Sequence, residues 1–294
     1  MSELDLFIDE ICHEYGCNLR SSEIIGKGYT SSIYKISDDL CIKITEKNTC
    51  PAFLTSLKNC ENLCIPIKTF VSPTSRYVGY VQRYVNSVSL QDYIVKGKRF
   101  GENDIAHIIF DVLKGLAVLH EHGYVHRDFY PGNIMIHSHR DTYAAVIIDF
   151  DETQKIKNDT RACFRYSGYH APEIVIYDDF YDEKSEIFAV GVMMWELLFG
   201  NCPFGGYSFF GSVIATSWDD YERNSNSYHR NVADALLNLK ICVKNTAGLS
   251  NECSDLLLKL LAEDKNERIS APLAMKHAFF AGLRCELERD KFEK

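Results

Sequence analysis

The feature that most constrains this 294-residue chain is the polar segment 126–133, which reads HRDFYPGN. Asp128 can accept a proton from an attacking hydroxyl, and Asn133, five residues later, can bind a divalent cation. Asp149 follows at the end of the apolar run 144–148, where a carboxylate is costly unless an ion or a donor pairs with it. Singly, Asp128 could cap a turn and Asp149 could be a loop acid. Together, in this order, they predict a site in which Asn133 and Asp149 hold Mg²⁺.

A glycine-containing turn and a strand lysine form a second group. Gly26 and Gly28 flank Lys27 between two strand-like runs, and glycine there lets backbone N–H groups approach a phosphate closely. Gly-x-Gly is common in hairpin turns, so this segment alone is a weak signal. Lys43 lies in the apolar strand 41–44, where an ammonium needs an anionic partner, and ATP phosphates would serve. The alternative is an edge-strand lysine that points to water.

The order of strand-like and helical patterns indicates an α+β protein with two lobes. Residues 3–15 place apolar side chains at helical spacing behind Ser2, a possible N-cap, so we expect a helical extension over 1–20. Strand-like runs then predict a β-rich N-lobe over 21–85, and mainly helical patterns predict a larger C-lobe over 86–294. The expected helices include 102–122, 185–199, 231–242, 252–262 and 271–281, and the expected strands include 65–71, 77–85, 134–137 and 145–149.

The composition indicates which kinds of binding partner are not expected for this chain: nucleic acid, a membrane and zinc. The net charge of −9 argues against a nucleic-acid binder and weakly against an anionic membrane surface. No run approaches 18 apolar residues without a charge, so we expect no membrane-spanning segment. The eleven cysteines contain no C-x-x-C pair, and no signal-peptide pattern opens the chain, which favours a reducing, cytoplasmic compartment. We expect no zinc site, because no pair of thiols completes one with the histidines near residue 126.

These segments resemble, in order and spacing, the motif set of the eukaryotic-type protein kinases over about residues 22–280. The resemblance implies a bilobal kinase fold in which 26–31 is the glycine-rich loop and Lys43 positions the phosphates of ATP. The run 80–85 is similar to the strand that enters the hinge. Adenine would then bond the backbone of Arg83 and Val85.

The resemblance also implies the chemistry. Asp128 would be the catalytic base, and Asn133 and Asp149 would bind Mg²⁺, with Mn²⁺ as an alternative ion. The implied reaction transfers the γ-phosphoryl group of ATP to hydroxyls of a protein substrate, Ser/Thr rather than Tyr. The substrate itself and the oligomeric state are left open.

Two distant matches support the resemblance. Glu173, in Ala-Pro-Glu, falls where the family ends its activation segment, and Arg268 falls where the family keeps its pairing arginine. A buried Glu–Arg pair of this kind would anchor structure without taking part in chemistry. Between them, Glu186 stands in the segment that resembles the family's central helix, in place of an aspartate.

Three departures concern the nucleotide side of the site. Ser31 replaces the third loop glycine. Asp151 replaces the glycine of Asp-Phe-Gly, so it loses glycine's freedom at positive φ and adds negative charge beside the metal. No acid lies between residues 47 and 60, where the helix with the lysine-pairing glutamate should fall. Either Glu61 takes that role, or Lys43 lacks this partner.

Further departures concern the substrate side and regulation. Tyr130 stands where Ser/Thr kinases usually carry lysine, and Tyr166 stands where they usually carry threonine, so a repacked pair is plausible. Arg127 either receives a phosphate on the activation segment or only packs locally. Thr160 and Tyr166 are the hydroxyls we name as phosphosites.

Three functions therefore stay open. The first is an active protein kinase. The second is a pseudokinase that serves as a binding or scaffold module, supported by Ser31, Asp151 and the missing glutamate. The third is a small-molecule kinase of the sugar-kinase type, which would not be expected to carry Glu173 within Ala-Pro-Glu or the Arg268 anchor.

Overall fold

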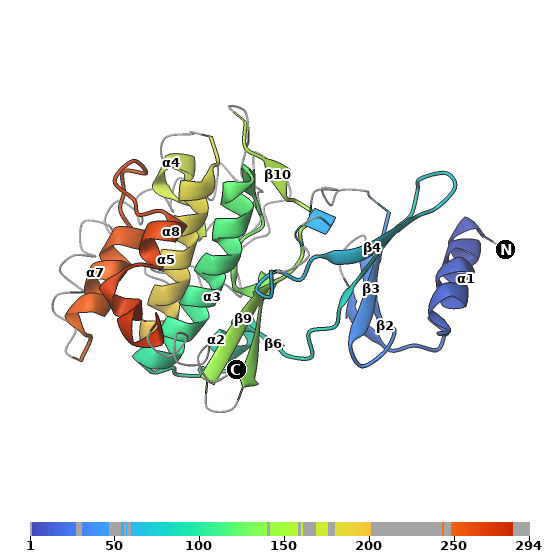
Figure 1. Ribbon diagram of the computed structural model, residues 1–294, viewed down its shortest axis with the longest axis horizontal. Coiled ribbons are helices and arrows are strands. Elements are labelled where there is room, and N and C mark those ends of the chain that lie inside the picture. The colour runs from blue at the N-terminus through green and yellow to red at the C-terminus, as the bar shows by residue number, and fades with distance from the viewer. Residues whose placement is uncertain are drawn as a thin grey trace. The chain divides into compact units, whose positions relative to one another are not determined.

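The computed structural model describes residues 2–27, 31–46, 54–55, 57, 60–139, 142–157, 160, 169–175, 180–200, 243 and 248–284. The chain divides into two compact units. The first comprises Met1–Ser87 and Ile148–Glu152, and the second comprises Val88–Ile147 and Thr153–Lys294. The first unit contains the β-rich part and the second the main helices (Figure 1). The short segment Ile148–Glu152, which we expected in the C-lobe, belongs to the first unit.

A five-stranded antiparallel sheet forms the first unit, in the order β1-β2-β3-β5-β4. Its strands are β1 Ile24–Lys27, β2 Ser31–Lys35, β3 Leu40–Thr45, β4 Pro66–Val71 and β5 Val78–Arg83. Lys43 is paired in register with Ile33 on one side and Tyr80 on the other, so these three side chains share one face of the sheet. Because successive residues alternate between faces, Ile42 and Ile44 lie on the opposite face.

Helix α1, Glu3–Tyr15, covers that opposite face. Ser2 is its N-cap, as predicted, and the structure adds a reciprocal capping box between Ser2 and Asp5. Gly16 ends the helix at φ 59°. Phe7 and Ile11 are buried against the sheet in one cluster with Ile42. Both side chains also approach Gly79, where an added Cβ would lie 3.4 Å from Phe7 and from Ile11. Figure 1 shows the helix alongside the strands.

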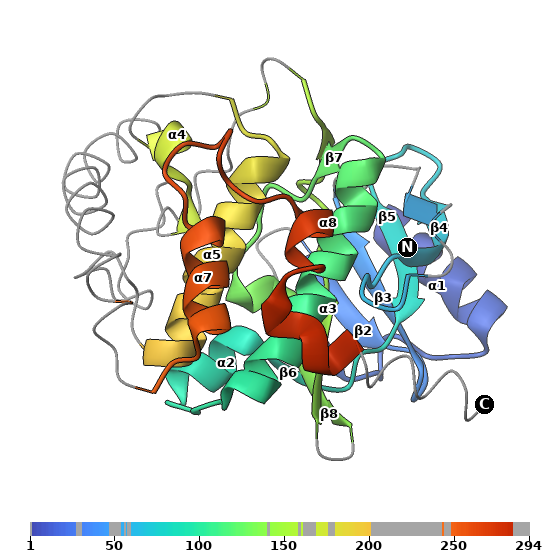
Figure 2. The same cartoon turned by 60° about the vertical axis from the view of Figure 1, so that its left-hand side comes forward.

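The second unit is built around two long helices, α3 Glu102–Glu121 and α5 Glu183–Phe199, which pack against each other (Figure 2). Helix α5 is buried over most of its length, as its continuous apolar sequence predicts. Its Gly191 permits close packing with Leu261, because an added Cβ would lie 2.8 Å from that side chain. The other helices among the described residues are α2 Leu90–Val95, α4 Pro172–Val175, α7 Asn251–Leu260, α8 Ala271–Ala274 and the 3₁₀ turns η2 Pro131–Asn133 and η4 Ala278–Phe280.

Two small antiparallel sheets complete the second unit. One joins β6 Val88–Ser89, β8 Ile134–His139 and β9 Thr142–Ile147, and the other joins β7 Tyr124–Val125 to β10 Gln154–Lys155. Strands β7 and β8 flank the polar segment 126–133, and Asp149 follows the end of β9 after one intervening residue. The ends of these strands therefore position the loops that carry the predicted site residues.

One predicted helix is wrong and one lies outside the described residues. The segment 271–281 is not a continuous helix, because His277 has an extended backbone with φ −61° and ψ 151° and starts a new turn. Its Nδ1 accepts a hydrogen bond from the backbone N–H of Phe279, as an N-cap does. The expected helix 231–242 falls outside the described part. Among the helices that are described, none is both long and apolar enough to cross a bilayer.

Candidate active site

The polar segment after β7 forms a tight loop closed by η2. The Asn133 side-chain amide donates to the Asp128 backbone carbonyl at 2.7 Å and to its carboxylate Oδ2 at 3.1 Å. The Asn133 backbone N–H donates to the carbonyl of Tyr130, which closes the 3₁₀ turn behind Pro131. Asn133 is 5% exposed, so its side chain is held in one orientation by packing as well as hydrogen bonding. The loop therefore fixes the Asp128 carboxylate and brings these two predicted residues together.

A buried carboxylate of α5 anchors the same loop. Glu186 is fully buried, and its Oε1 accepts from the backbone N–H of Arg127 at 2.9 Å. Its Oε2 lies 2.8 Å from His120 Nε2, an ion pair when the imidazole is protonated. Arg127 has φ 69°, a left-handed conformation that costs a non-glycine residue about 1–3 kcal/mol. The hydrogen bond that the Arg127 N–H donates to Glu186 offsets part of that cost. Glutamate, although longer than the family's aspartate, therefore still anchors the loop.

Tyr130 packs against its own loop. An added Cβ on Gly132 would lie 2.3 Å from the Tyr130 ring, so the ring rests on the face of that glycine. The predicted partner Tyr166 lies outside the described residues. The pairing of the two tyrosines therefore stays a prediction.

In the first unit, Lys43 is buried and forms two ion pairs. Its Nζ lies 2.6 Å from Asp149 Oδ1 and 2.8 Å from Asp151 Oδ2. Burial disfavours the ammonium, but the two carboxylates outweigh it and raise the pKa of Lys43 above its ordinary value. Burial also raises the pKa of Asp151, with Asp149 adding to the effect and Lys43 opposing it. The strand lysine thus meets an anionic cluster on its own face of the sheet.

The segment that carries these carboxylates has one left-handed residue. Asp149 has φ 63°, a conformation that aspartate adopts more readily than most residues. Among the described non-glycine residues, positive φ occurs at Ser75, Arg127 and Asp149. Asp151 therefore needs none of the conformational freedom of the glycine that it replaces, and the expected strain at this position is absent.

The structure does not bring Glu61 to Lys43. The Glu61 side chain is exposed, and its backbone carbonyl accepts from the Arg83 guanidinium at 2.8 Å. Within the described residues, the ion pairs of Lys43 are those with Asp149 and Asp151. Our choice of Glu61 rested on linear distance, and the fold places it at the end of β5 instead. Sequence reasoning missed Asp151 as a partner of this lysine.

The predicted adenine contacts lie at the end of β5. The Arg83 carbonyl accepts from the thiol of Cys64 at 3.3 Å, and the Cys41 sulfur lies 3.7 Å away. Val85 is half-buried just beyond the strand. In the glycine-rich loop, Gly26 and Lys27 end strand β1, while Gly28 lies outside the described residues.

Of the two predicted phosphosites, only Thr160 is described. Thr160 is 2% exposed, and its hydroxyl accepts from the backbone N–H of Lys157 at 2.9 Å. Its carbonyl also accepts from the backbone N–H of Tyr181 at 2.8 Å. A kinase could therefore reach this hydroxyl only after the local structure opened, which counts against Thr160 as a phosphosite.

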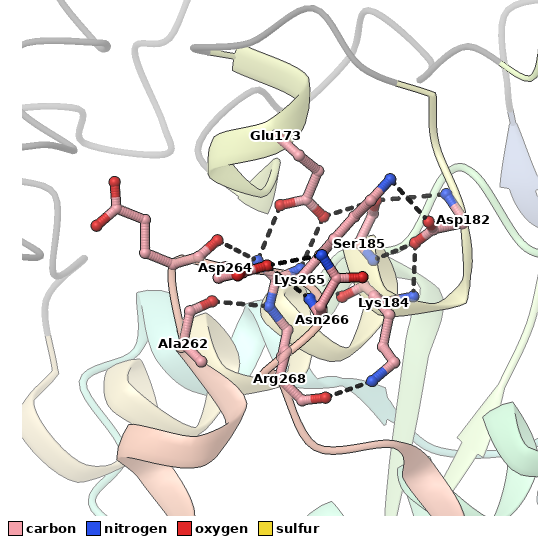
Figure 3. A network of polar contacts seen from close by, with 10 residues as sticks. Glu173, Asp182, Lys184, Ser185, Ala262, Asp264, Lys265, Asn266 and Arg268 are labelled. Atoms are coloured by element: carbon pink, nitrogen blue, oxygen red, sulfur yellow. Dashed lines mark hydrogen bonds and ion pairs between the residues drawn. The ribbon is translucent and has the colours of Figure 1, made fainter.

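Glu173 and Arg268 form a bidentate pair, with N–O distances of 2.7 and 2.8 Å (Figure 3). Both side chains are almost fully buried. The Arg268 guanidinium also donates to the backbone carbonyls of Ala262 and Lys184, and the Ser185 hydroxyl donates to Glu173. The pair thus connects α4, the start of α5 and the segment after α7 within the second unit.

The two residues that we predict as metal ligands both carry oxygen donors, Asn133 in the second unit and Asp149 in the first. Mg²⁺ prefers oxygen ligands, and the Asn133 amide oxygen and the Asp149 carboxylate are of that kind. The described residues contain no group of three or more histidine, cysteine, aspartate or glutamate side chains arranged for a metal ion. Each residue by itself offers the type of oxygen ligand that Mg²⁺ uses when phosphate supplies further ligands.

Comparison with known proteins places these features in a family. The chain is 24% identical over 293 residues to MAP kinase-interacting serine/threonine-protein kinase 1 of Xenopus tropicalis, covering 89% of this chain and 68% of that protein. It is 28% identical over 198 residues to human Serine/threonine-protein kinase MAK, covering 63% of this chain but only 31% of that protein. The family model described as "Protein kinase domain" matches residues 19–280, and the predicted α+β kinase fold is confirmed. The chain therefore belongs to the protein kinase family.

Proposed function

We propose that this chain is an ATP- and Mg²⁺-dependent protein kinase whose acceptors are serine and threonine hydroxyls. The observation that carries the proposal is the clamp of the Asn133 amide on Asp128, which holds a carboxylate in a fixed place for an incoming hydroxyl. The names of both relatives as serine/threonine-protein kinases support the choice of acceptor. The change to Tyr130 is the feature that departs from that class.

Each residue has a role in the proposed reaction. Asp128 orients the acceptor hydroxyl and takes up its proton as the hydroxyl oxygen bonds to the γ-phosphorus of ATP. The bond from that phosphorus to the β–γ bridging oxygen breaks, and ADP leaves. Lys43 binds the phosphates of ATP, and the backbone of Arg83 and Val85 receives adenine. Asn133 and Asp149 would hold Mg²⁺, which neutralises charge on the transferring phosphoryl group when it is bound. The protein contributes mainly position and electrostatic stabilisation.

A binding module without transfer activity is the second candidate. Its support is that Glu61 lies away from Lys43 and that two carboxylates surround this single ammonium, which leaves a net negative charge where phosphates would bind. Such a protein would still bind nucleotide if a divalent cation restored the charge balance. The two candidates differ only in whether phosphate is transferred.

The deciding experiment uses the purified chain with Mg²⁺, γ-labelled ATP and a mixed protein substrate, beside Asp128→Asn and Asp149→Ala. We expect label on phosphoserine and phosphothreonine that falls by at least a hundredfold in both variants. Thermal stabilisation by Mg²⁺·ATP without any label would support the binding module and contradict the kinase. Label that appears only on an added sugar or other metabolite would contradict the choice of protein as acceptor.

A further inference from the structure

We propose that Asp151 positions Lys43 for phosphate binding, in place of the glutamate that the family takes from the helix after β3. The inference rests on the proposed function, because it concerns the lysine that would hold the phosphates of ATP. It assigns a role to the residue that departs from the family's Asp-Phe-Gly motif. In this role Asp151 acts through Lys43 and is a positioning residue, not a catalytic one.

The geometry gives Lys43 two carboxylates and one remaining donor. An ammonium has three N–H groups, and the contacts at 2.6 Å to Asp149 and 2.8 Å to Asp151 use two of them. The Lys43 side chain is 7% exposed, so it cannot turn out to water to satisfy its charge. Within the part of the chain that the structure describes, these two ion pairs leave the third N–H group for a phosphate oxygen.

The two carboxylates differ in what else they must do. Asp149 is the proposed metal ligand, so its charge is shared with a cation once nucleotide is bound. The Asp151 side chain is 26% exposed and that of Asp149 is 39% exposed. Asp151 does not bind metal in the proposed reaction. Asp151 is thus the carboxylate that can remain on the ammonium while Asp149 turns to the metal.

The backbone conformation at Asp151 lets an aspartate side chain reach Lys43 without strain. This residue follows Asp149 by two positions and reaches the same amine without a left-handed backbone, although its family counterpart is glycine. Meanwhile the acid chosen from the sequence, Glu61, contacts Arg83 through its carbonyl and points its side chain to solvent. Asp151 thus gives Lys43 an acidic partner that Glu61 does not provide.

The first test compares Asp151→Gly, Asp151→Asn and Asp151→Glu, with Glu152→Gln as a control that removes a neighbouring exposed charge. We expect kcat/KM for ATP to fall at least tenfold in Asp151→Gly and Asp151→Asn, to recover partly in Asp151→Glu, and to stay within twofold in Glu152→Gln. The glycine variant is decisive, because it restores the family's residue. Equal or higher activity in Asp151→Gly would overturn the proposal and show that Asp151 only competes with phosphate.

The second test needs no turnover. A double-mutant cycle of Lys43→Met and Asp151→Asn, read as the thermal midpoint with and without Mg²⁺·ADP, isolates the coupling between the two side chains. We expect Asp151→Asn to lower the midpoint, and to reduce the stabilisation by Mg²⁺·ADP, only when Lys43 is present. Equal effects in both backgrounds would overturn the proposal. If the native chain transfers no phosphate, the proposed function fails, while this cycle still decides whether Asp151 positions Lys43.

Discussion

Single buried charges explain much of the arrangement of this protein. Lys43, Glu173 and Arg268 are each at most 5% exposed, and each has an opposite charge within 2.8 Å. Glu186 is fully buried beside His120 and the backbone N–H of Arg127. A buried charge without such partners would cost several kcal/mol, so these residues restrict which segments can come together. The partners of these buried charges therefore show which segments of the chain must lie next to one another.

Glu196 gives a prediction that depends on pH. Burial raises the pKa of Glu196 to about 7, against the lowering effect of the Tyr169 hydroxyl, which donates to it at 2.7 Å. The folded state therefore keeps a proton that the unfolded chain loses near pH 4.5, so stability falls as pH rises from about 4.5 to 7. Glutamine cannot ionise and can still accept the Tyr169 bond. We expect Glu196→Gln to be more stable than the native chain at pH 8 by roughly 1–3 kcal/mol, and about equal at pH 4.5.

Urea denaturation at pH 4.5, 6 and 8 measures this difference. Glu252→Gln, at an exposed position in the second unit, is the matched control and should show little change with pH. The prediction fails if the stability gain of Glu196→Gln is the same at all three pH values. In that case the pKa of Glu196 would be the same in the folded and the unfolded chain.

The limits of sequence reasoning show most clearly at Lys43. Its strand is apolar, so the need for an anion follows from local sequence alone. The identity of that anion does not, because Asp149 lies 106 residues away along the chain. Linear distance from Lys43 favours Glu61, and the sequence pattern marks Asp151 as a lost glycine that adds negative charge beside the metal, not as a partner of the lysine. Only the end of β9, where the chain returns to the first unit, brings both carboxylates to the amine.

At the scale of elements, strongly periodic or continuously apolar segments were predicted well. The helix expected at 102–122 occupies Glu102–Glu121, and the one expected at 185–199 starts two residues earlier because Asp182 caps it. The failure at 271–281 has a local cause, since a histidine in an extended conformation caps a new turn. Apolar spacing does not report such side-chain capping, and histidine is not among the usual N-cap residues.

Helix α1 gives a prediction about how an added element stabilises the first unit. Phe7 is 1% exposed and packs on the face of the sheet opposite Lys43. Phe7→Ala would leave a cavity above Ile42 and Gly79, and we expect a loss of about 3–5 kcal/mol. Leu6→Ala, one position along and 54% exposed, is the control and should change stability by less than about 0.5 kcal/mol.

Thermal denaturation monitored by circular dichroism compares the two variants. Lys68 and Glu14 also pair between β4 and α1, but both are exposed, so the packing of Phe7 should dominate. Similar midpoints for Phe7→Ala and Leu6→Ala would contradict this account. Helix α1 would then be an appendage that the sheet does not need.

At the scale of the whole molecule, distant segments are joined by a few buried polar contacts. The segment Ile148–Glu152 leaves the second unit and joins the first, where Asp149 and Asp151 meet Lys43. Glu173 and Arg268 are separated by 95 residues and join α4 to the segment after α7. Local sequence patterns predicted the helices and strands. The buried polar contacts, which join residues far apart in the sequence, show which segments lie together within one unit.

The Glu173–Arg268 pair gives the last prediction. Arg268→Met would leave Glu173 buried without its cation, and breaking a buried pair in this way typically costs about 3–5 kcal/mol. In Glu173→Gln/Arg268→Met no charge is left unpaired, so we expect the double variant to lose less stability than the sum of the two single variants. Lys265→Ala is the control from the same region (Figure 3): its pair with Asp182 at 3.2 Å is partly exposed and should contribute no more than about 1 kcal/mol. Urea midpoints of the four variants test this. If the effects of the single variants simply add, Glu173 and Arg268 are not coupled, and the apolar contacts around α5 would have to hold α4 in place by themselves.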